Sequence, residues 1–235
     1  MIYLYNVIFY QPILNILVFF YNTIAFRDFG LAIIFTTLLV RFLFYPFFHK
    51  SSHQQMVMQR IQPKVKKIQE IHKDNKEKQG QALMDLYKEH DVNPFSSILL
   101  LIIQLPILIA LYQIVQLSFG AEVLSQLYSF VAAPGAINAT LLGWINLSDK
   151  NLALVVCAAI AQYFQARLAI YQVKGEAPSQ SQKIANQMAI MGPILTIFIF
   201  YNFPAAVGLY WFVSSLFSVL QQLVINKKLK EKYGE

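Results

Sequence analysis

Long apolar stretches dominate this 235-residue chain, and they decide which solvent can surround it. Hydrophobic residues make up 57% of the sequence and charged residues only 13%, whereas soluble domains are about a quarter charged. A soluble core of this length could not hide so much apolar surface, so lipid must surround most of the chain. The sequence therefore predicts an all-α membrane protein that forms one domain, residues 1–235.

A membrane-spanning helix needs about 20 mainly apolar residues. Five stretches are expected to cross the membrane as helices: 29–48, 94–117, 152–171, 187–201 and 205–225. The fourth is the shortest, and the triplet Asn202-Phe203-Pro204 separates it from the fifth. The sequence thus predicts five transmembrane helices, the last two of which follow each other closely.

The first 26 residues are apolar enough to compete as a sixth span. However, Gln11, Asn15 and Asn22 would lie within about 40° of one another on a helix, and Pro12 suits a first helical turn. We therefore expect a helix over 1–26 that lies in the membrane interface, with a sixth span as the alternative. Residues 1–26 lack a basic n-region, and no small-x-small cleavage site follows their apolar stretch, so a cleavable signal peptide is not expected.

The segment 50–91 is strongly hydrophilic, with nine basic and six acidic residues. Two apolar stripes recur in it at helical spacing: Met58, Ile61, Val65 and Ile68, then Leu83, Leu86 and Tyr87. Between the stripes, Asp74-Asn75 and Gly80 break the pattern. This arrangement predicts a hairpin of two antiparallel helices joined by a turn.

The chain carries 19 Lys and Arg against 12 Asp and Glu, a formal charge of +7. In a soluble protein this excess would suggest nucleic acid, but here the basic residues cluster between and after apolar spans, so no nucleic-acid binding is expected. The clusters are the 50–91 hairpin, the 173–184 loop with Lys174 and Lys183, and the 226–235 tail with Lys227, Lys228, Lys230 and Lys232. Because basic loops stay in the cytoplasm, we expect a cytoplasmic C-terminus and an N-terminus outside or at the interface.

Arg41 is the most informative residue of the spans. It lies about 10 Å from the expected cytoplasmic end of the first span, at 1.5 Å per residue. A charge near mid-membrane costs at least about 2.5 kcal/mol and is usually paired, yet no Asp or Glu occurs within the five spans. The side chain either extends to the headgroups or faces a hydrophilic groove and awaits an acidic group on another molecule.

Polar residues on other spans favour the groove. Trp211, Ser215, Ser218 and Gln222 share one face of the fifth span, Gln162 and Gln165 share a face of the third, and the second carries Gln104. Single polar residues often only hydrogen-bond neighbouring helices, but stripes on several helices beside an unpaired arginine predict a shared groove. The candidate substrate-binding residues are Arg41, Gln104, Gln162, Gln165, Trp211, Ser215 and Ser218.

Several motifs, in the expected order, resemble the YidC family of membrane protein insertases. They are GLAIIFTTLLVR (30–41), IQPKVKKIQE (61–70), LYKEHDVNP (86–94), QLPILIALY (104–112) and NFPAAVGLYW (202–211). The sequence departs from the family pattern after Asn93-Pro94, where Ser96-Ser97-Ile98 replaces the frequent Gly-Gly-Cys. The likeness is to the short bacterial forms, which lack a large external domain.

The resemblance implies an insertase in a bacterial plasma membrane, with a groove that opens to the cytoplasm and to lipid. The groove positions of the family are matched in this sequence by Arg41, Gln104, Gln165 and Trp211. The implied partners are nascent membrane proteins and the lipid bilayer, with the Sec translocon and the ribosome as further candidates. No cofactor or metal is expected, and the single cysteine, Cys157, excludes a disulfide within the chain.

Two other classes of membrane protein fit the sequence less well. A transporter or channel would be expected to show inverted repeats, paired interrupted helices or an intramembrane carboxylate, and the five spans show none of these. An intramembrane protease or lipid-modifying enzyme would need a catalytic set such as a Ser–His or Asp pair within the spans. The protein is therefore not expected to be an enzyme.

Overall fold

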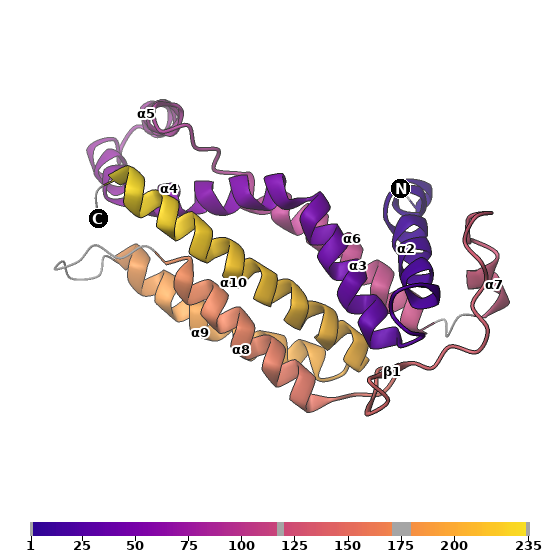
Figure 1. The fold of residues 1–235 in the computed structure, drawn as a ribbon. Helices are drawn as coiled ribbons and strands as arrows, with labels where there is room; N and C mark the ends of the chain where they lie inside the picture. The colour runs from indigo at the N-terminus through magenta and orange to yellow at the C-terminus, as the bar shows by residue number, and fades with distance from the viewer. Residues whose placement is uncertain (1, 117–119, 171–179, 234–235) are drawn as a thin grey trace.

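The computed structural model describes residues 2–116, 120–170 and 180–233, and most of them are helical (Figure 1). The elements are α1 (Ile2–Tyr5), the π-helix η1 (Asn6–Tyr10), α2 (Gln11–Asn22), α3 (Phe29–Leu43), α4 (Tyr45–Ile71), α5 (Lys76–Glu89), α6 (Ser96–Gln116), α7 (Ala121–Leu124), β1 (Thr140–Leu141), β2 (Ile145–Asn146), α8 (Leu152–Leu168), α9 (Gln180–Phe200) and α10 (Ala205–Tyr233). One end of the molecule carries α4, α5 and the C-terminus and is called the α4–α5 end. The other carries the antiparallel β1–β2 hairpin and is called the β-hairpin end.

Three helical segments are long and apolar enough to cross a membrane: Tyr3–Asn22, Lys183–Phe200 and Ala205–Lys228. A fourth results if α3 and α4 are counted as one broken span, and Ile102–Gln116 and Leu152–Leu168 are shorter apolar helices. Within the described residues, length and composition thus support three to four spans, where the sequence predicted five. The predicted ends of the second and third spans, at 117 and 171, lie outside the described residues.

The first predicted span, 29–48, does not continue as one straight helix. The α3 helix ends at Leu43, and α4 begins at Tyr45 with its axis turned by 68°. Pro46 lies in the first turn of α4, where a proline is tolerated because that turn needs no N–H donor, but where it cannot extend the hydrogen bonding of a preceding helix. The bend leaves Arg41 in the last turn of α3.

The last two helices extend beyond their predicted bounds. The α9 helix begins at Gln180 rather than at 187, and α10 continues to Tyr233 through most of the predicted 226–235 tail. Lys174 lies outside the described residues. Helices α8, α9 and α10 run side by side (Figure 1), and α10 also packs along α3. Val155, Phe200 and Val207 form an apolar cluster where the three helices meet.

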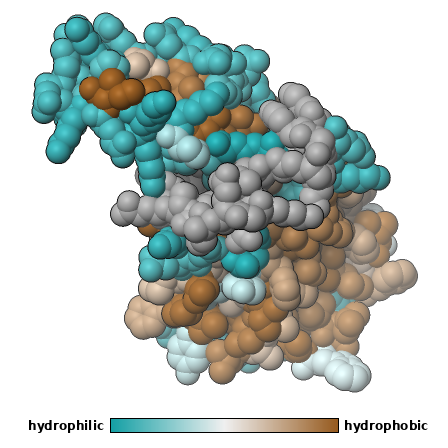
Figure 2. All heavy atoms as spheres, turned by 90° about the vertical axis from the view of Figure 1, so that its left-hand side faces the viewer, coloured by the Kyte–Doolittle hydropathy of each residue, from teal (hydrophilic) through white to brown (hydrophobic). Residues whose placement is uncertain are grey.

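Helices α4 and α5 pack against each other through the apolar stripes of the 50–91 segment, with Ile61, Val65 and Leu86 buried. The Asn75 side chain caps α5 by accepting a hydrogen bond from the Lys78 backbone N–H at 3.0 Å. Gly80 lies inside α5 and not at the turn between the helices. Figure 2 shows hydrophilic residues gathered over this part of the molecule and hydrophobic residues below it.

Two residues of the polar stripe on the first helix bond to other parts of the protein, Asn15 from a buried position and Asn22 from an exposed one. Asn15 is only 3% exposed; its side chain donates to the Gln126 carbonyl at 3.2 Å and accepts from the Tyr128 N–H at 2.6 Å. Asn22 donates to the Ala132 carbonyl at 2.8 Å. These two residues therefore bind the segment between α6 and β1, so their spacing alone does not show that this helix lies among headgroups.

The β-hairpin covers the beginning of α3. Gly30 lies so close to the hairpin that an added Cβ would be 2.9 Å from the Leu141 Cα. One carboxylate oxygen of Asp28 accepts from the Leu31 N–H at 2.8 Å and caps α3, while the other accepts from the Leu142 N–H at 2.5 Å. A single side chain thus holds both the helix and the hairpin.

The residues after the hairpin bind the beginnings of α10 and α8. The Ala205 N–H donates to the Asp149 carbonyl at 2.7 Å, and the Ala206 N–H donates to the Leu147 carbonyl at 3.0 Å. The Asn151 side chain caps α8. These contacts, together with those of Gly30 and Asp28, are called the hairpin seal; they hold together the starts of three helices at the β-hairpin end.

Candidate functional site

A polar cavity of about 130 Å³ lies among α3, α4, α6, α8 and α10. It is lined by Arg41, Phe48, Ser52, Gln104, Gln165, Trp211, Ser214, Ser215, Ser218 and Gln221. Along α10 the lining extends from Trp211 to Gln221, about 15 Å at 1.5 Å per residue. None of these described lining residues is acidic. The cavity therefore combines a guanidinium group with neutral polar side chains.

Arg41 points into this cavity. Its side chain is 7% exposed, its Nε donates to the Ser214 Oγ at 2.8 Å, and its Nη2 donates to the same oxygen. The guanidinium carbon lies 4.4 Å from the centre of the Phe48 ring, a distance at which a cation and an aromatic face attract each other. Of the two arrangements considered from the sequence, the structure has the inward one.

Gln104 and Ser214 connect Arg41 to the interior of the bundle. The Gln104 Nε2 donates to the Tyr210 hydroxyl at 2.6 Å and to the Ser214 Oγ at 3.3 Å. Ser214 is 1% exposed and Tyr210 is 2% exposed. The chain of polar groups from Tyr210 to Arg41 joins α3, α6 and α10, and all its members except the half-buried Gln104 are buried.

Gln162, one of the predicted site residues, lies behind the cavity wall. Its Oε1 accepts from the Thr196 hydroxyl at 2.5 Å and from the Trp211 Nε1 at 3.2 Å. It therefore links α8 to α9 and α10, and it is not among the residues that line the cavity, although its partner Trp211 is. Gln222, on the same predicted face as Trp211, instead bonds to Asn226 at 2.9 Å and contacts the Met56 sulfur.

Six of the seven predicted site residues line the cavity: Arg41, Gln104, Gln165, Trp211, Ser215 and Ser218. The sequence analysis missed Ser214, although it lies three residues after Trp211 and four before Ser218, and side chains at these spacings share a helix face. It also missed Phe48 and Ser52. Both come from α4, and the bend that brings α4 over the cavity was not predicted.

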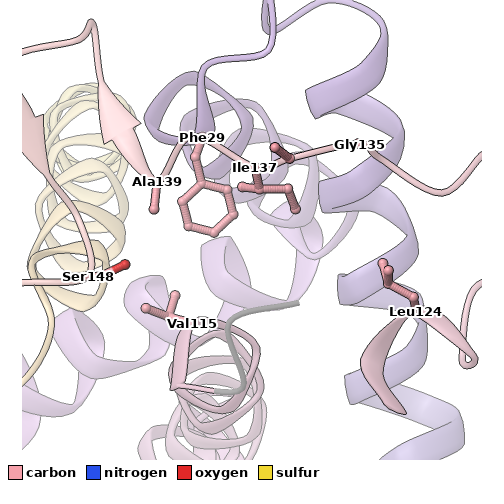
Figure 3. A pocket seen from close by; sticks show the side chains of 8 residues that line it. Phe29, Val115, Leu124, Gly135, Ile137, Ala139 and Ser148 are labelled. Carbon is pink, nitrogen blue, oxygen red and sulfur yellow. The ribbon is translucent and has the colours of Figure 1, made fainter. Parts of the chain in front are cut away.

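A second cavity, of about 300 Å³, lies at the β-hairpin end (Figure 3). It is lined by Phe29, Val115, Leu124, Gly135, Ala136, Ile137, Ala139 and Ser148. None of these described side chains titrates near neutral pH. Elsewhere in the described chain there is no group of three His, Cys, Asp or Glu side chains suited to a metal ion. The Arg41 cavity is therefore the candidate site.

The 60Kd inner membrane protein family matches the chain over residues 19–232. The chain belongs to this family. Three curated relatives are each named Membrane protein insertase YidC. Those from Geotalea daltonii and Geobacter metallireducens are 31% and 29% identical over 93% of this chain, and the one from Francisella philomiragia is 30% identical over 85%. The chain spans 37%, 37% and 33% of the length of these relatives.

Membership of the 60Kd inner membrane protein family confirms the resemblance predicted from the sequence motifs. Together with its apolar helices, it makes the chain a multi-pass membrane protein. The matched range includes every residue that lines the Arg41 cavity. The cavity thus lies in the part of the chain that defines the family.

Proposed function

We propose that this chain inserts proteins into the membrane. It takes an apolar segment of a nascent protein at the α4–α5 end and transfers it into the bilayer, without nucleotide hydrolysis and without a covalent step. The observation that carries the proposal is the inward-facing Arg41 guanidinium in a polar cavity whose described lining has no acidic residue. The names of the curated relatives support the same function.

The proposed orientation places the α4–α5 end and the C-terminus in the cytoplasm of a bacterial cell. Basic residues near membrane spans favour the cytoplasmic side, and α4, α5 and the end of α10 carry most of the lysines in the chain. The first helix is proposed to lie in the opposite interface. The Tyr5 hydroxyl donates to Gln113 in the last turn of α6, and Asn22 bonds to Ala132. Both ends of the first helix therefore contact the β-hairpin end of the molecule.

The cavity lowers the barrier that opposes insertion. Each unpaired polar group in hydrocarbon costs several kcal/mol, so the hydrophilic flank of a substrate cannot cross the bilayer easily. Two unit charges 4 Å apart attract by about 4 kcal/mol at an effective dielectric constant of 20. The attraction of one acidic residue to Arg41 would therefore offset the cost of placing about one unpaired polar group in hydrocarbon. This favours substrates with short acidic flanks.

The size of the cavity limits what can enter it. A volume of about 130 Å³ holds roughly four water molecules at about 30 Å³ each, whereas a helix with its side chains is about 10–12 Å across. A substrate helix does not fit. Only its polar flank would occupy the cavity, while its apolar segment would move along the lipid-facing surface beside α8 and α10. Partition into lipid then supplies the driving force.

Reconstitution into liposomes tests the proposal. We expect Arg41→Ala to reduce insertion of a single-span substrate with an acidic flank about tenfold or more, since a loss of 1.4 kcal/mol is already tenfold, and Arg41→Lys to retain more insertion. A substrate with a neutral flank should be much less affected. Arg167→Ala is the matched control, because Arg167 is exposed on α8 and bonds to Asn186 instead of lining the cavity.

Two outcomes would contradict the proposal. Equal insertion of the acidic-flank substrate by the unmodified protein and by Arg41→Ala would show that the Arg41 charge plays no part in insertion. Ion flux or a released product in the same liposomes, without insertion, would instead indicate a channel or an enzyme.

A further inference from the structure

The tip of the β1–β2 hairpin presents large apolar side chains to its surroundings. Trp144 is 92% exposed and Leu142 is 64% exposed. They flank Gly143, whose φ of +74° lets the chain reverse within this short hairpin. Tryptophan is highly buried on average in folded proteins. An indole this exposed indicates a partner outside the described chain, and Leu142 beside it extends the apolar tip.

The hairpin tip is rigidly held. The Leu142 N–H bonds to Asp28, the Trp144 N–H donates to the Leu141 carbonyl at 3.0 Å, and Leu141 packs on Gly30. Holding an apolar tip in one place reduces the entropy lost when it binds its partner.

Other side chains at the same end show what surrounds the tip. Tyr201 is 53% exposed at the end of α9, and the Lys150 ammonium group lies 5.8 Å from its ring and bonds to Asn202 at 3.0 Å. Tyrosine and tryptophan gather at both membrane–water interfaces, where the ring lies at headgroup level. Three residues before Tyr201, Phe198 on α9 is 77% exposed, as expected of a helix in contact with acyl chains. The Trp144 tip thus lies at the end of the molecule where an exposed tyrosine follows an apolar helix.

We propose that Leu142 and Trp144 insert into the boundary between headgroups and acyl chains of the leaflet at the β-hairpin end. Phospholipid is the partner, and the tip anchors the hairpin seal in the membrane. The indole presents its apolar ring to the acyl chains and its N–H to the headgroup oxygens. This lipid contact does not depend on the insertion activity proposed above.

The two tryptophans of the chain, Trp144 and Trp211, make a direct test possible. In Trp211→Phe, Trp144 is the sole tryptophan. We expect its emission to be lost progressively as phosphatidylcholine brominated high on the acyl chain replaces unlabelled lipid in the vesicles, and less so with bromine near the chain end. Both leaflets carry the label, so the orientation of the protein does not affect the result. If Trp211→Phe folds poorly, the emission of the Trp144→Phe variant is subtracted from that of the unmodified protein, and the difference gives the emission of Trp144.

Acrylamide, a quencher dissolved in water, distinguishes the alternatives. Loss of emission with acrylamide but not with brominated lipid would place the tip in water and overturn the proposal. No loss with either quencher would place it against protein, such as a second copy, and would also overturn it. Stronger loss with bromine near the chain end would place the indole deeper than the interface, against the proposal. Insertion activity is measured separately, so its failure leaves this result unaffected.

Discussion

The two ends of this helical bundle are built by opposite means. Around Arg41 the helices are joined through side-chain hydroxyl and amide groups, and the cavity between them contains a buried guanidinium group. At the β-hairpin end, the starts of α3, α8 and α10 are held by backbone hydrogen bonds, helix caps and the contact of Gly30 with Leu141. The cavity at Arg41 therefore offers a charge to a polar group, whereas the cavity at the β-hairpin end has no charged residue in its described lining and the helix starts around it are held by backbone contacts.

Under the proposed function, this difference would let one bundle ease the passage of polar groups without becoming a pore. A polar path through the whole bilayer would conduct ions, whereas a polar cavity limited to part of its depth only shortens the hydrocarbon that a flank must cross. In the proposed function, the cavity opens at the α4–α5 end while the hairpin seal keeps the helix starts at the opposite end in place. The variants below perturb each end separately.

The largest effect on stability is expected from Gly30→Ala. The new methyl group would lie 2.9 Å from the Leu141 Cα, so backbone must move, and overpacking of this kind costs about 1–3 kcal/mol. At about 2–4 °C per kcal/mol for a chain of this size, the midpoint of thermal unfolding should fall by about 2–12 °C. Heating the detergent-solubilised protein and measuring the fraction that remains monodisperse gives this midpoint.

Gly80→Ala is the matched control for that variant. Gly80 lies inside α5 with nothing within 4 Å of an added Cβ, and alanine is favoured over glycine in helices by about 1 kcal/mol. The midpoint should stay the same or rise. If Gly30→Ala behaved like Gly80→Ala, the close contact between α3 and the hairpin would be absent in solution.

Substitutions of Asp28 should lower the midpoint of thermal unfolding by less, and two variants separate the part due to the helix cap from the part due to the bond with the hairpin. Asp28→Ala removes both the cap on Leu31 and the bond to Leu142, and we expect a loss of about 1–2 kcal/mol, since a cap alone is worth about 1 kcal/mol. Asp28→Asn can keep the cap but puts an N–H₂ group opposite the Leu142 N–H. Its midpoint of thermal unfolding should lie between those of the unmodified protein and Asp28→Ala. Equal midpoints for the two variants would assign the whole effect to the bond with the hairpin.

The contrast between the ends was only partly predictable from the sequence. Arg41 could be found because a charge within an apolar stretch is costly wherever the helix packs. Gln165 and Trp211 could be found because helical periodicity places each on a face with other polar residues. Gln104 could be found as a polar residue within an apolar span and as a match to a groove position of the family. These signals are local. Gln162 carries the same local signal, yet it bonds to Thr196 on another helix, and the spacing along one helix cannot show which neighbour will be there.

The bend after Leu43 illustrates the other limit. Apolar residues continue to Phe48, so composition extends the predicted span, whereas a new helix with Pro46 in its first turn begins at 68° to the first. The bend brings Phe48 and Ser52 over the cavity. The hairpin seal was not predicted at all, because its main contacts are backbone hydrogen bonds and the close approach of Gly30 to Leu141, and neither leaves a periodic pattern in the sequence.

The smallest effect, and the sharpest test of the cavity, is expected from Ser214→Ala. The Ser214 hydroxyl accepts from two nitrogens of Arg41, so we infer that it positions the guanidinium. Water can replace the lost oxygen, so insertion of an acidic-flank substrate should fall only about fivefold, equivalent to about 1 kcal/mol for a hydrogen bond. Ser214→Thr, which keeps the hydroxyl, should restore it, and insertion of a neutral-flank substrate should not change.

A double-mutant cycle separates positioning by Ser214 from a general loss of packing. If Ser214 acts through Arg41, then Ser214→Ala should have no further effect in a protein that already carries Arg41→Ala, because coupled residues are not additive. A similar loss in both backgrounds would show that Ser214 only packs α10 against its neighbours. An increase in insertion with Ser214→Ala would show instead that the hydroxyl competes with the substrate carboxylate for Arg41. Both of these last two outcomes would show that Ser214 does not preorganise the charge of Arg41, which is the feature that distinguishes the α4–α5 end from the β-hairpin end.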